Sequence, residues 1–172
     1  MRFLVILSLI FLSSCAIFKG KKQKVVVTGM IEIHKPYCGG AKPTPEMAKG
    51  TREAYSNTTF YVKSAMNNDP KKETVLKFKT DEKGNYSIKL KKGSYFVIHE
   101  DKVLTFEKYV EKNKQTSNKF LEYIGDKDAK TEYEHVDFLL DVQENKEFNY
   151  AYKTRCFSGL NMLLKYVGPL PQ

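Results

Sequence analysis

The 172-residue sequence is poor in the residues and motifs that most often carry catalysis. It contains three cysteines, three histidines and no tryptophan. It lacks a Cys-x-x-Cys pair, a Gly-x-Ser-x-Gly segment and a His-Glu-x-x-His segment, which are local patterns of redox or zinc sites, serine hydrolases and zinc peptidases. Enzymes that depend on these ordered motifs are therefore excluded. We expect no catalytic residue and no cofactor.

A long apolar run occurs only at the N-terminus, where Phe3 to Leu12 follow the charged Arg2. The run is too short to span a bilayer as a stable helix, and this pattern is typical of an export signal. The segment Leu12-Ser13-Ser14-Cys15 resembles the lipobox of bacterial lipoproteins. This resemblance implies a signal peptide over residues 1–14 and a diacylglycerol on Cys15, whose acyl chains would give stable anchoring. The alternative is an ordinary signal peptide, or a membrane anchor, with an unrelated cysteine.

Removal of residues 1–14 would leave 158 of the 172 residues, enough for one domain with a core but not for two. Residues 15–24 contain four lysines and would form a lipidated basic tether. Each lysine near an anionic lipid surface contributes about 1 kcal/mol. No acidic pair follows Cys15, so we expect an anchor that faces the periplasm. Residues 25–172 are then a single domain.

The formal charge of +9 is unevenly spread along the chain. Residues 19–119 hold 22 basic and 11 acidic side chains, whereas residues 120–147 hold nine acidic and three basic ones. Lysines on the outer faces of strands explain the excess, because they also protect sheet edges from pairing with other chains. Since an exported protein is not expected to bind nucleic acid, the expected partners are the membrane and an unknown envelope protein or glycan.

The stretch from Thr80 to Ile98 gives the clearest structural signal. Residues 81–85, with Gly84, form a turn cluster. Apolar residues alternate with lysines on both sides of this turn, which is typical of half-buried strands. A second reversal at Lys92-Gly93 leads into an apolar strand, so the pattern predicts a β-meander. The alternating apolar residues are Leu76, Phe78, Tyr86, Ile88 and Leu90.

The segments TDEKGNYSIKL and KKGSYFV resemble the carboxypeptidase regulatory-like domain, a small transthyretin-like β-sandwich. Val25 to Ile31 would supply its opening strand, so the resemblance covers about residues 24–101. It implies a mainly β fold, a transthyretin-like or Ig-like sandwich with a few short helices in insertions, and a non-enzymatic binding or structural role. The chain departs from the family in a loop insertion at 35–58 and in a C-terminal extension after about residue 102.

The insertion contains several prolines and glycines that prevent regular structure at its start. Thr44-Pro45-Glu46 has the pattern of an N-cap followed by proline at the first helical position, which predicts a short helix from Pro45 to about Lys49. An ordered loop of this kind needs an attachment, and Cys38 is the obvious one.

Once Cys15 carries lipid, Cys38 and Cys156 are the remaining thiols. We expect them to form a disulfide, because an exported chain lies in an oxidising compartment. The alternative is a copper or zinc site formed by His34 and Cys38 with Cys156 or His99.

Two catalytic alternatives use acids or a thiol. Cys38 with His34 or His135 would be a minimal nucleophile and base. The pairs Asp126/Asp128 and Glu132/Glu134 could act as glycosidase carboxylates, although a polar loop explains them more simply.

The C-terminal part mixes helix and strand patterns. Residues 104–110 have helical spacing, and Ser117 could cap a helix from Asn118 to Ile124 that ends at Gly125. Periodicity leaves residues 133–142 undecided between strand and helix. Residues 147–155 should be a strand that delivers Cys156 to the edge of the core, and 161–167 a last apolar element. The eleven tyrosines and eleven phenylalanines are expected in the core, with a sugar or peptide groove as the alternative.

The sequence therefore predicts a lipid-anchored, non-enzymatic binding or accessory module of the bacterial cell envelope. The competing hypothesis is a small periplasmic metal-binding protein that uses His34, Cys38 and Cys156.

Overall fold

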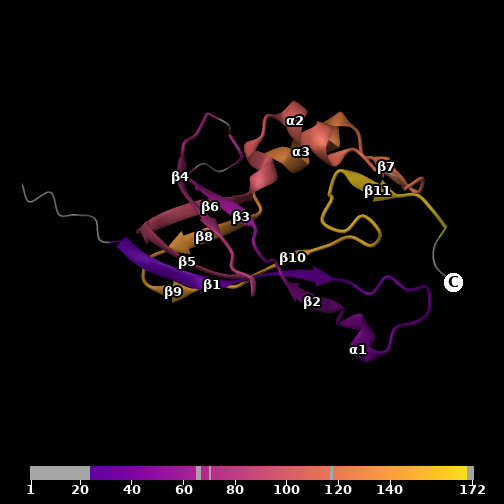
Figure 1. Ribbon diagram of the computed structural model, residues 1–172, viewed down its shortest axis with the longest axis horizontal. Coiled ribbons are helices and arrows are strands. Elements are labelled where there is room, and N and C mark those ends of the chain that lie inside the picture. Colours follow the sequence, from indigo (N-terminus) through magenta and orange to yellow (C-terminus); the bar gives the residue numbers. More distant parts are fainter. Residues whose placement is uncertain (1–23, 65–66, 70, 117, 170–172) are drawn as a thin grey trace, which may run out of the picture.

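Two β-sheets pack face to face, and a group of short helices lies at one end of them (Figure 1). The computed structural model describes residues 24–64, 67–69, 71–116 and 118–169. The predicted signal peptide, Cys15 with its predicted lipid, most of the predicted basic tether and Ser117 lie outside the described residues.

The first sheet is built on the long strand β1 (Lys24–Lys35), which changes partners halfway along its length. Its first half pairs with β5 and β9, and its second half with β2 and β10. The change occurs near Gly29, where a Cβ atom would lie 1.9 Å from the carbonyl oxygen of Phe148, so glycine is required there. The partners are β2 (Thr51–Ala54), β5 (Asn85–Lys91), β9 (Lys146–Glu147) and β10 (Tyr150–Lys153).

The second sheet has four antiparallel strands in the order β4-β3-β6-β8. They are β4 (Thr74–Lys79), β3 (Thr59–Lys63), β6 (Gly93–His99) and β8 (Phe138–Val142).

The core of the sandwich lies between these two sheets and is apolar. Each sheet contributes alternate residues, with Val27 and Ile31 from one and Phe60 and Leu140 from the other. Strands β5, β6 and β8 bury one face because successive side chains point to opposite sides of a sheet. The prediction of a mainly β sandwich with a few short helices is confirmed.

The predicted β-meander is wrong. Strand β4 pairs with β3, whereas β5 pairs with β1, so the turn at residues 81–85 crosses from one sheet to the other. Strand β6 then returns to the sheet of β3. Alternation shows which face of a strand is buried, but both sheets of a sandwich bury their faces toward the same interior. The period therefore cannot tell whether consecutive strands pair with each other.

The helical cap, residues 100–134, has its own small core. Tyr109, Val110, Ala129 and Tyr133 pack together with Leu163 from a later segment. The helix predicted over 118–124 is wrong, because residues 121–123 form a strand that pairs with 164–166. The elements of this part are η1 (Glu100–Val103), α2 (Phe106–Asn113), β7 (Leu121–Tyr123), α3 (Asp126–Glu134) and β11 (Leu164–Tyr166).

Residues after 102, predicted as an extension of the core, contribute strands to both sheets. Residues 133–142 end helix α3 and then form β8, which supplies Phe138, Leu140 and Val142 to the core. Strands β9 and β10 pair in parallel with β1. The predicted strand over 147–155 is thus present in its central part.

The region 35–58 contains regular structure. Helix α1 (Pro45–Ala48) is capped by Thr44, whose hydroxyl accepts a hydrogen bond from the Met47 amide at 3.3 Å. This confirms the helix predicted from Thr44-Pro45-Glu46. Within the described ranges, none of the helices has the length and apolar character needed to cross a membrane.

Candidate functional site

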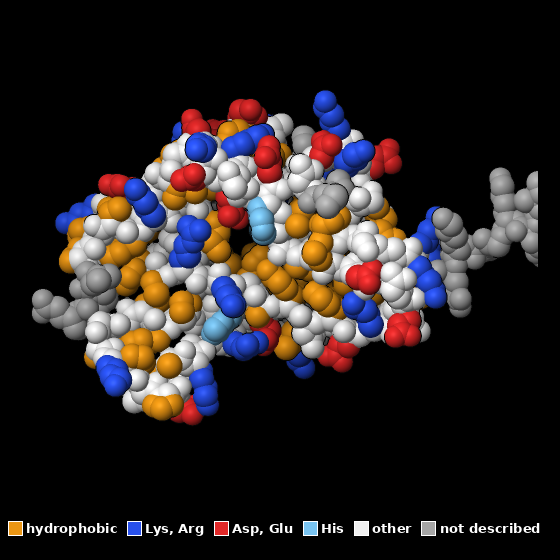
Figure 2. Space-filling model, turned by 180° about the vertical axis from the view of Figure 1, so that it is seen from behind, with side chains coloured by type: hydrophobic (Ala, Val, Ile, Leu, Met, Phe, Trp, Pro, Cys, Tyr) orange, Lys and Arg blue, Asp and Glu red, His pale blue; other side chains and the backbone are white. Residues whose placement is uncertain are grey.

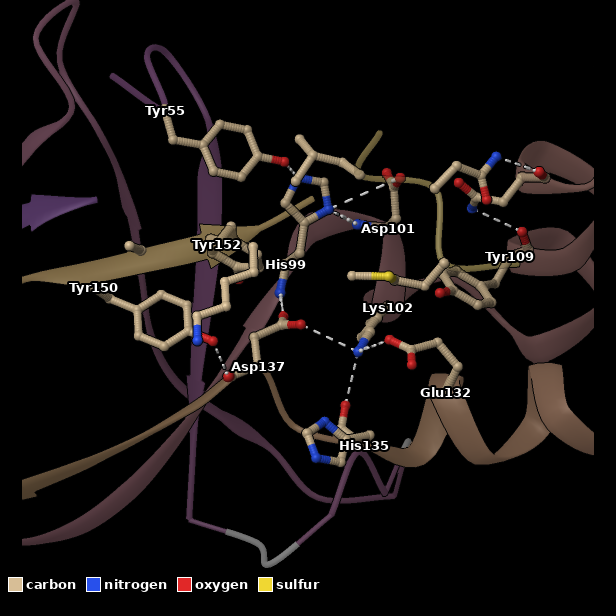
Figure 3. Close-up of a pocket in the computed structure, with 16 residues that line it drawn as sticks. Tyr55, His99, Asp101, Lys102, Tyr109, Glu132, His135, Asp137, Tyr150 and Tyr152 are labelled. Carbon is tan, nitrogen blue, oxygen red and sulfur yellow. Dashed lines mark hydrogen bonds and ion pairs between the residues drawn. The ribbon is translucent and has the colours of Figure 1, made fainter. Parts of the chain in front are cut away.

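A pocket with a volume of about 680 Å³ lies where the sandwich meets the helical cap. Its walls come from segments far apart in the sequence: the residue after β2, the end of β6, η1, α2, α3, the start of β8, β10 and the loop at 160–162. Figure 3 shows these side chains converging from the sheet on one side and the helices on the other. The space-filling view in Figure 2 shows a face of the molecule that is hollowed near its centre. This volume is in the range of small-molecule sites.

One wall of the pocket is a chain of hydrogen bonds through His99. The Asp101 amide donates to Nδ1 of His99 at 3.2 Å, so the proton of the neutral ring lies on Nε2. That Nε2–H donates to the hydroxyl oxygen of Tyr55 at 3.0 Å. The Tyr55 hydroxyl then keeps its own proton for another acceptor. Burial, with the Asp101 and Asp137 carboxylates, raises the pKa of Tyr55, which keeps the phenol neutral.

A second wall is a buried ion-pair network around Lys102. Its ammonium nitrogen lies 3.1 Å from Asp137 Oδ1 and 3.3 Å from Glu132 Oε1, and donates to the His135 carbonyl oxygen at 2.9 Å. The other carboxylate oxygen of Asp137 accepts a hydrogen bond from the His99 amide. A buried charge is tolerated only when it is paired and hydrogen-bonded. The Lys102 network satisfies that condition.

Tyrosines form the third component of the pocket. The ring of Tyr152 stands nearly perpendicular to those of Tyr55 and Tyr150, at centroid separations of 5.3 and 5.0 Å. Tyr150 donates its hydroxyl proton to the Asp137 carbonyl oxygen at 2.8 Å. The hydroxyl oxygen of Tyr152 is buried and finds no hydrogen-bond partner among the described residues. Such a group costs free energy unless something else satisfies it.

Burial and nearby carboxylates raise the pKa of the tyrosines around the pocket. Burial raises the pKa of Tyr109, and Glu132, Asp137 and Asp101 raise it further. Burial followed by the Asp137 carboxylate raises the pKa of Tyr150 and Tyr152. The same carboxylates thus act on tyrosines in every wall. A potential that disfavours phenolate also disfavours an anionic ligand.

The predicted disulfide between Cys38 and Cys156 is present. It joins the loop after β1 to the loop after β10, across a sequence separation of 118. Leu160 and Met162, a few residues after Cys156, line the pocket. The disulfide therefore fixes the segment that closes one side of the site.

The metal-site hypothesis is not supported. The sulfurs of Cys38 and Cys156 are bonded to each other, and His34 Nε2 is hydrogen-bonded to the Lys49 carbonyl oxygen at 2.8 Å. No group of three or more His, Cys, Asp or Glu side chains suited to a metal ion occurs in the described part of the chain. The same disulfide removes Cys38 as a nucleophile.

The acidic pairs proposed from the sequence are separated in the structure. Glu132 lines the pocket and forms an ion pair with Lys102. Glu134 instead pairs with Lys130 at 3.4 Å on the exposed face of α3. Asp126 accepts a hydrogen bond from the hydroxyl of Tyr123, and Asp126 and Asp128 lie in the first turn of α3. They do not form a pair of facing carboxylates.

Several pocket residues had no signal in the sequence. Tyr55, Lys102 and Asp137 lie in or beside short connections, and no motif joins them. His99 and His135 were considered only as metal ligand and base. The site is assembled from connections at the end of the sandwich, where neighbours in space are distant in sequence.

Comparison with protein-family models gives no match, and comparison with curated protein sequences gives none either. Among solved structures, the chain is similar to the Bacillus anthracis TIE protein, with 19% identity and a TM-score of 0.32 over 74% of this chain and 17% of that one. It is also similar to the shaft pilin spaA from Lactobacillus rhamnosus GG, with 10% identity and a TM-score of 0.36 over 76% of this chain and 49% of that one. The chain thus spans less than half the length of each. These likenesses are too distant to assign a family or a function.

Proposed function

We propose that this protein is a lipid-anchored, non-enzymatic binding module of the bacterial cell envelope, and that the pocket between the sandwich and the helical cap is its ligand site. The observation that carries the binding role is the Tyr152 hydroxyl, which is buried in the pocket without a partner among the described residues. A bound ligand would supply that partner.

The chemistry of the lining favours binding over nucleophilic catalysis. No serine, threonine or cysteine is among the described residues that line the pocket. The ionisable groups Lys102, Asp137 and Glu132 are held to one another by ion pairs. Groups fixed in this way shape a site and set its potential, and they are not free to attack a substrate.

The anchoring proposal rests on the N-terminal pattern that ends at Cys15, which lies outside the described residues. The fold supports it through the direction of β1, which begins at the end of the sandwich away from the helical cap (Figure 1). Ile33 pairs with Tyr152, and it lies about 30 Å along the strand from Lys24 at the usual rise per residue. An anchor before Lys24 would therefore leave the pocket facing away from the membrane.

Lipidation is tested by growing cells with labelled palmitate. The wild-type chain should incorporate the label and sediment with membranes, and Cys15→Ser should do neither. Ser14→Ala is the matched control and should retain both properties. Label on the Cys15→Ser variant, or an unlabelled wild-type chain, would overturn the anchoring proposal.

Binding is tested by thermal unfolding of the detergent-solubilised full chain against a mixed set of saccharides, short peptides, amines and carboxylates. At least one class should raise the unfolding temperature of the wild type but not that of Tyr109→Phe, whose hydroxyl lies in the pocket. Tyr61→Phe, on β3 and outside the pocket lining, should respond as the wild type does. If no compound distinguishes the wild type from Tyr109→Phe, the pocket is not a ligand site.

A further inference from the structure

We propose that the pocket recognises an organic ammonium group, held between tyrosine rings and carboxylates. This inference rests on the binding role proposed above, and it names the class of ligand.

Three carboxylates and two lysines line the pocket: Asp101, Glu132 and Asp137, with the buried Lys102 and the exposed Lys153. Asp101 is also paired with Lys112 at 2.6 Å, so the carboxylates that concern a ligand are Glu132 and Asp137. Lys102 contacts one oxygen of Glu132 and one of Asp137. The second carboxylate oxygen of Glu132 has no hydrogen-bond partner in the part of the chain that the structure describes. It is an available acceptor for an N–H donor or a counter-charge for a cation.

The tyrosine rings suit the same ligand. Tyr152 packs edge-to-face against both Tyr55 and Tyr150, at 88° to each, so the three rings form one aromatic cluster on the sheet side of the pocket. The negative face of an aromatic ring attracts a cation such as an ammonium group. Figure 3 shows Tyr55 and Tyr150 on the sheet side of the pocket and Glu132 on the helix side. A cation between them would meet rings on one side and a carboxylate on the other.

The unpartnered hydroxyl adds an independent argument. The oxygen of Tyr152 is buried and meets no hydrogen-bond partner among the described residues, and burial together with the nearby Asp137 carboxylate raises the pKa of this tyrosine. An alkylammonium N–H could donate to that oxygen. An anion would instead face the repulsion of the surrounding carboxylates.

The test uses choline, n-butylamine and the uncharged isostere of choline, 3,3-dimethylbutan-1-ol, in calorimetric titrations of the detergent-solubilised full chain. At least one of the two cations should bind, with an affinity at least about tenfold above that of the isostere. No binding of either cation, or an affinity of both cations that does not exceed that of the isostere, would overturn the ammonium proposal.

Two variants on helix α3 locate the interaction. Glu132→Gln should weaken cation binding about tenfold, because it removes a carboxylate charge while Lys102 keeps its ion pair with Asp137. Glu134→Gln removes a charge two residues later, on the exposed face, and should leave the affinity unchanged. Equal losses in both variants would place the cation on the surface and overturn the proposal.

These experiments distinguish failure of the ammonium proposal from failure of the proposed binding role. If the cations fail but a saccharide or peptide raises the unfolding temperature through Tyr109, only the ammonium inference is wrong. If nothing in the mixed set acts through Tyr109 and the cations also fail, the ammonium inference falls together with the ligand site.

Discussion

The interior of the sandwich and the wall of the pocket are both buried, but their side chains differ in chemistry. The sandwich interior is formed by alternate apolar residues of regular strands, such as Val27 and Val62. The pocket wall contains Lys102, Asp137 and a partnerless tyrosine hydroxyl, and most of its residues lie in connections or at the ends of elements. Apolar burial stabilises without requiring particular partners, whereas each buried charge must find one. The apolar interior of the sandwich therefore stabilises the fold, whereas the buried polar groups of the pocket wall lower the free energy of unfolding.

The largest expected effect comes from the disulfide that fixes the pocket wall. Replacing Cys38 and Cys156 together by alanine should lower the free energy of unfolding by about 4–5 kcal/mol, because the cross-link restricts a long loop in the unfolded chain. Denaturant titration measures the loss. A loss below about 1 kcal/mol would contradict the stabilising role of the cross-link.

The sandwich core is tested at Phe60, which is fully buried and lies 5.5 Å from Phe78 and 5.7 Å from Tyr55 between ring centroids. Phe60→Ala should cost about 4 kcal/mol, because it removes apolar contacts and leaves a cavity. The matched control is Phe157→Ala, where the ring is exposed and the loss should be much smaller. Similar losses at both positions would contradict the assignment of the core.

The ion-pair network is tested at Lys102, whose side chain is 6% exposed. Lys102→Met should cost about 3 kcal/mol, because it leaves the Asp137 and Glu132 carboxylates buried without their cation. The double variant Lys102→Met with Asp137→Asn should recover part of that loss. If the second substitution instead adds its own full cost, the two residues do not interact as the structure shows.

The partnerless hydroxyl makes a prediction of opposite sign. Tyr152→Phe should raise the free energy of unfolding by about 1 kcal/mol, because it removes a buried polar group that has no partner. Tyr86→Phe is the contrasting variant, because the Tyr86 hydroxyl donates to the Phe148 carbonyl oxygen at 2.7 Å and its loss should destabilise. Thermal unfolding of the two variants measures both signs. Destabilisation by Tyr152→Phe would mean that its hydroxyl already has a partner.

The smallest expected effect is at the turn between the sheets. Asp81 accepts hydrogen bonds from the amides of Lys83 and Asn85 at 2.8 Å, and the bonds with Asn85 lower its pKa. Because the folded pKa lies below the unfolded one, this stabilisation is complete above the unfolded pKa and is lost as the pH falls through the folded pKa. Asp81→Ala should therefore destabilise at neutral pH and converge on the wild type below about pH 4.

Urea titrations of Asp81→Ala and the wild type near neutral and near pH 3 check the expected convergence. Glu82→Ala, at the adjacent exposed residue, serves as the control and should show little difference at either pH. A gap for Asp81→Ala that stays constant with pH would contradict the role of the ionised carboxylate.

Strands β1, β4, β5, β6 and β10 were predictable from the sequence, whereas β2, β3, β9 and the pocket were not. Alternation identified the buried faces of β4, β5 and β6, and the Thr44-Pro45-Glu46 pattern identified α1. The predicted pairing of the strands on either side of residues 81–85 is wrong, because a turn between two sheets and a hairpin turn use the same residue types. The sequence predicts a helix where β7 forms, because the pairing of β7 with residues 164–166 is nonlocal. The site could not be predicted for the same reason: Tyr55, Lys102 and Asp137 become neighbours only when the helical cap packs on the sheet.

By itself, the sequence determined which faces of β5 and β6 are buried, where the first helix begins and which two cysteines can pair. These are local or compositional properties: side-chain alternation, capping and the count of thiols. The tertiary structure alone decided which strands pair, that a chain end predicted as an extension completes both sheets, and that Lys102 lies between Glu132 and Asp137. Those features depend on contacts between segments that are distant in sequence, and a local sequence pattern does not reveal the free energies of such contacts.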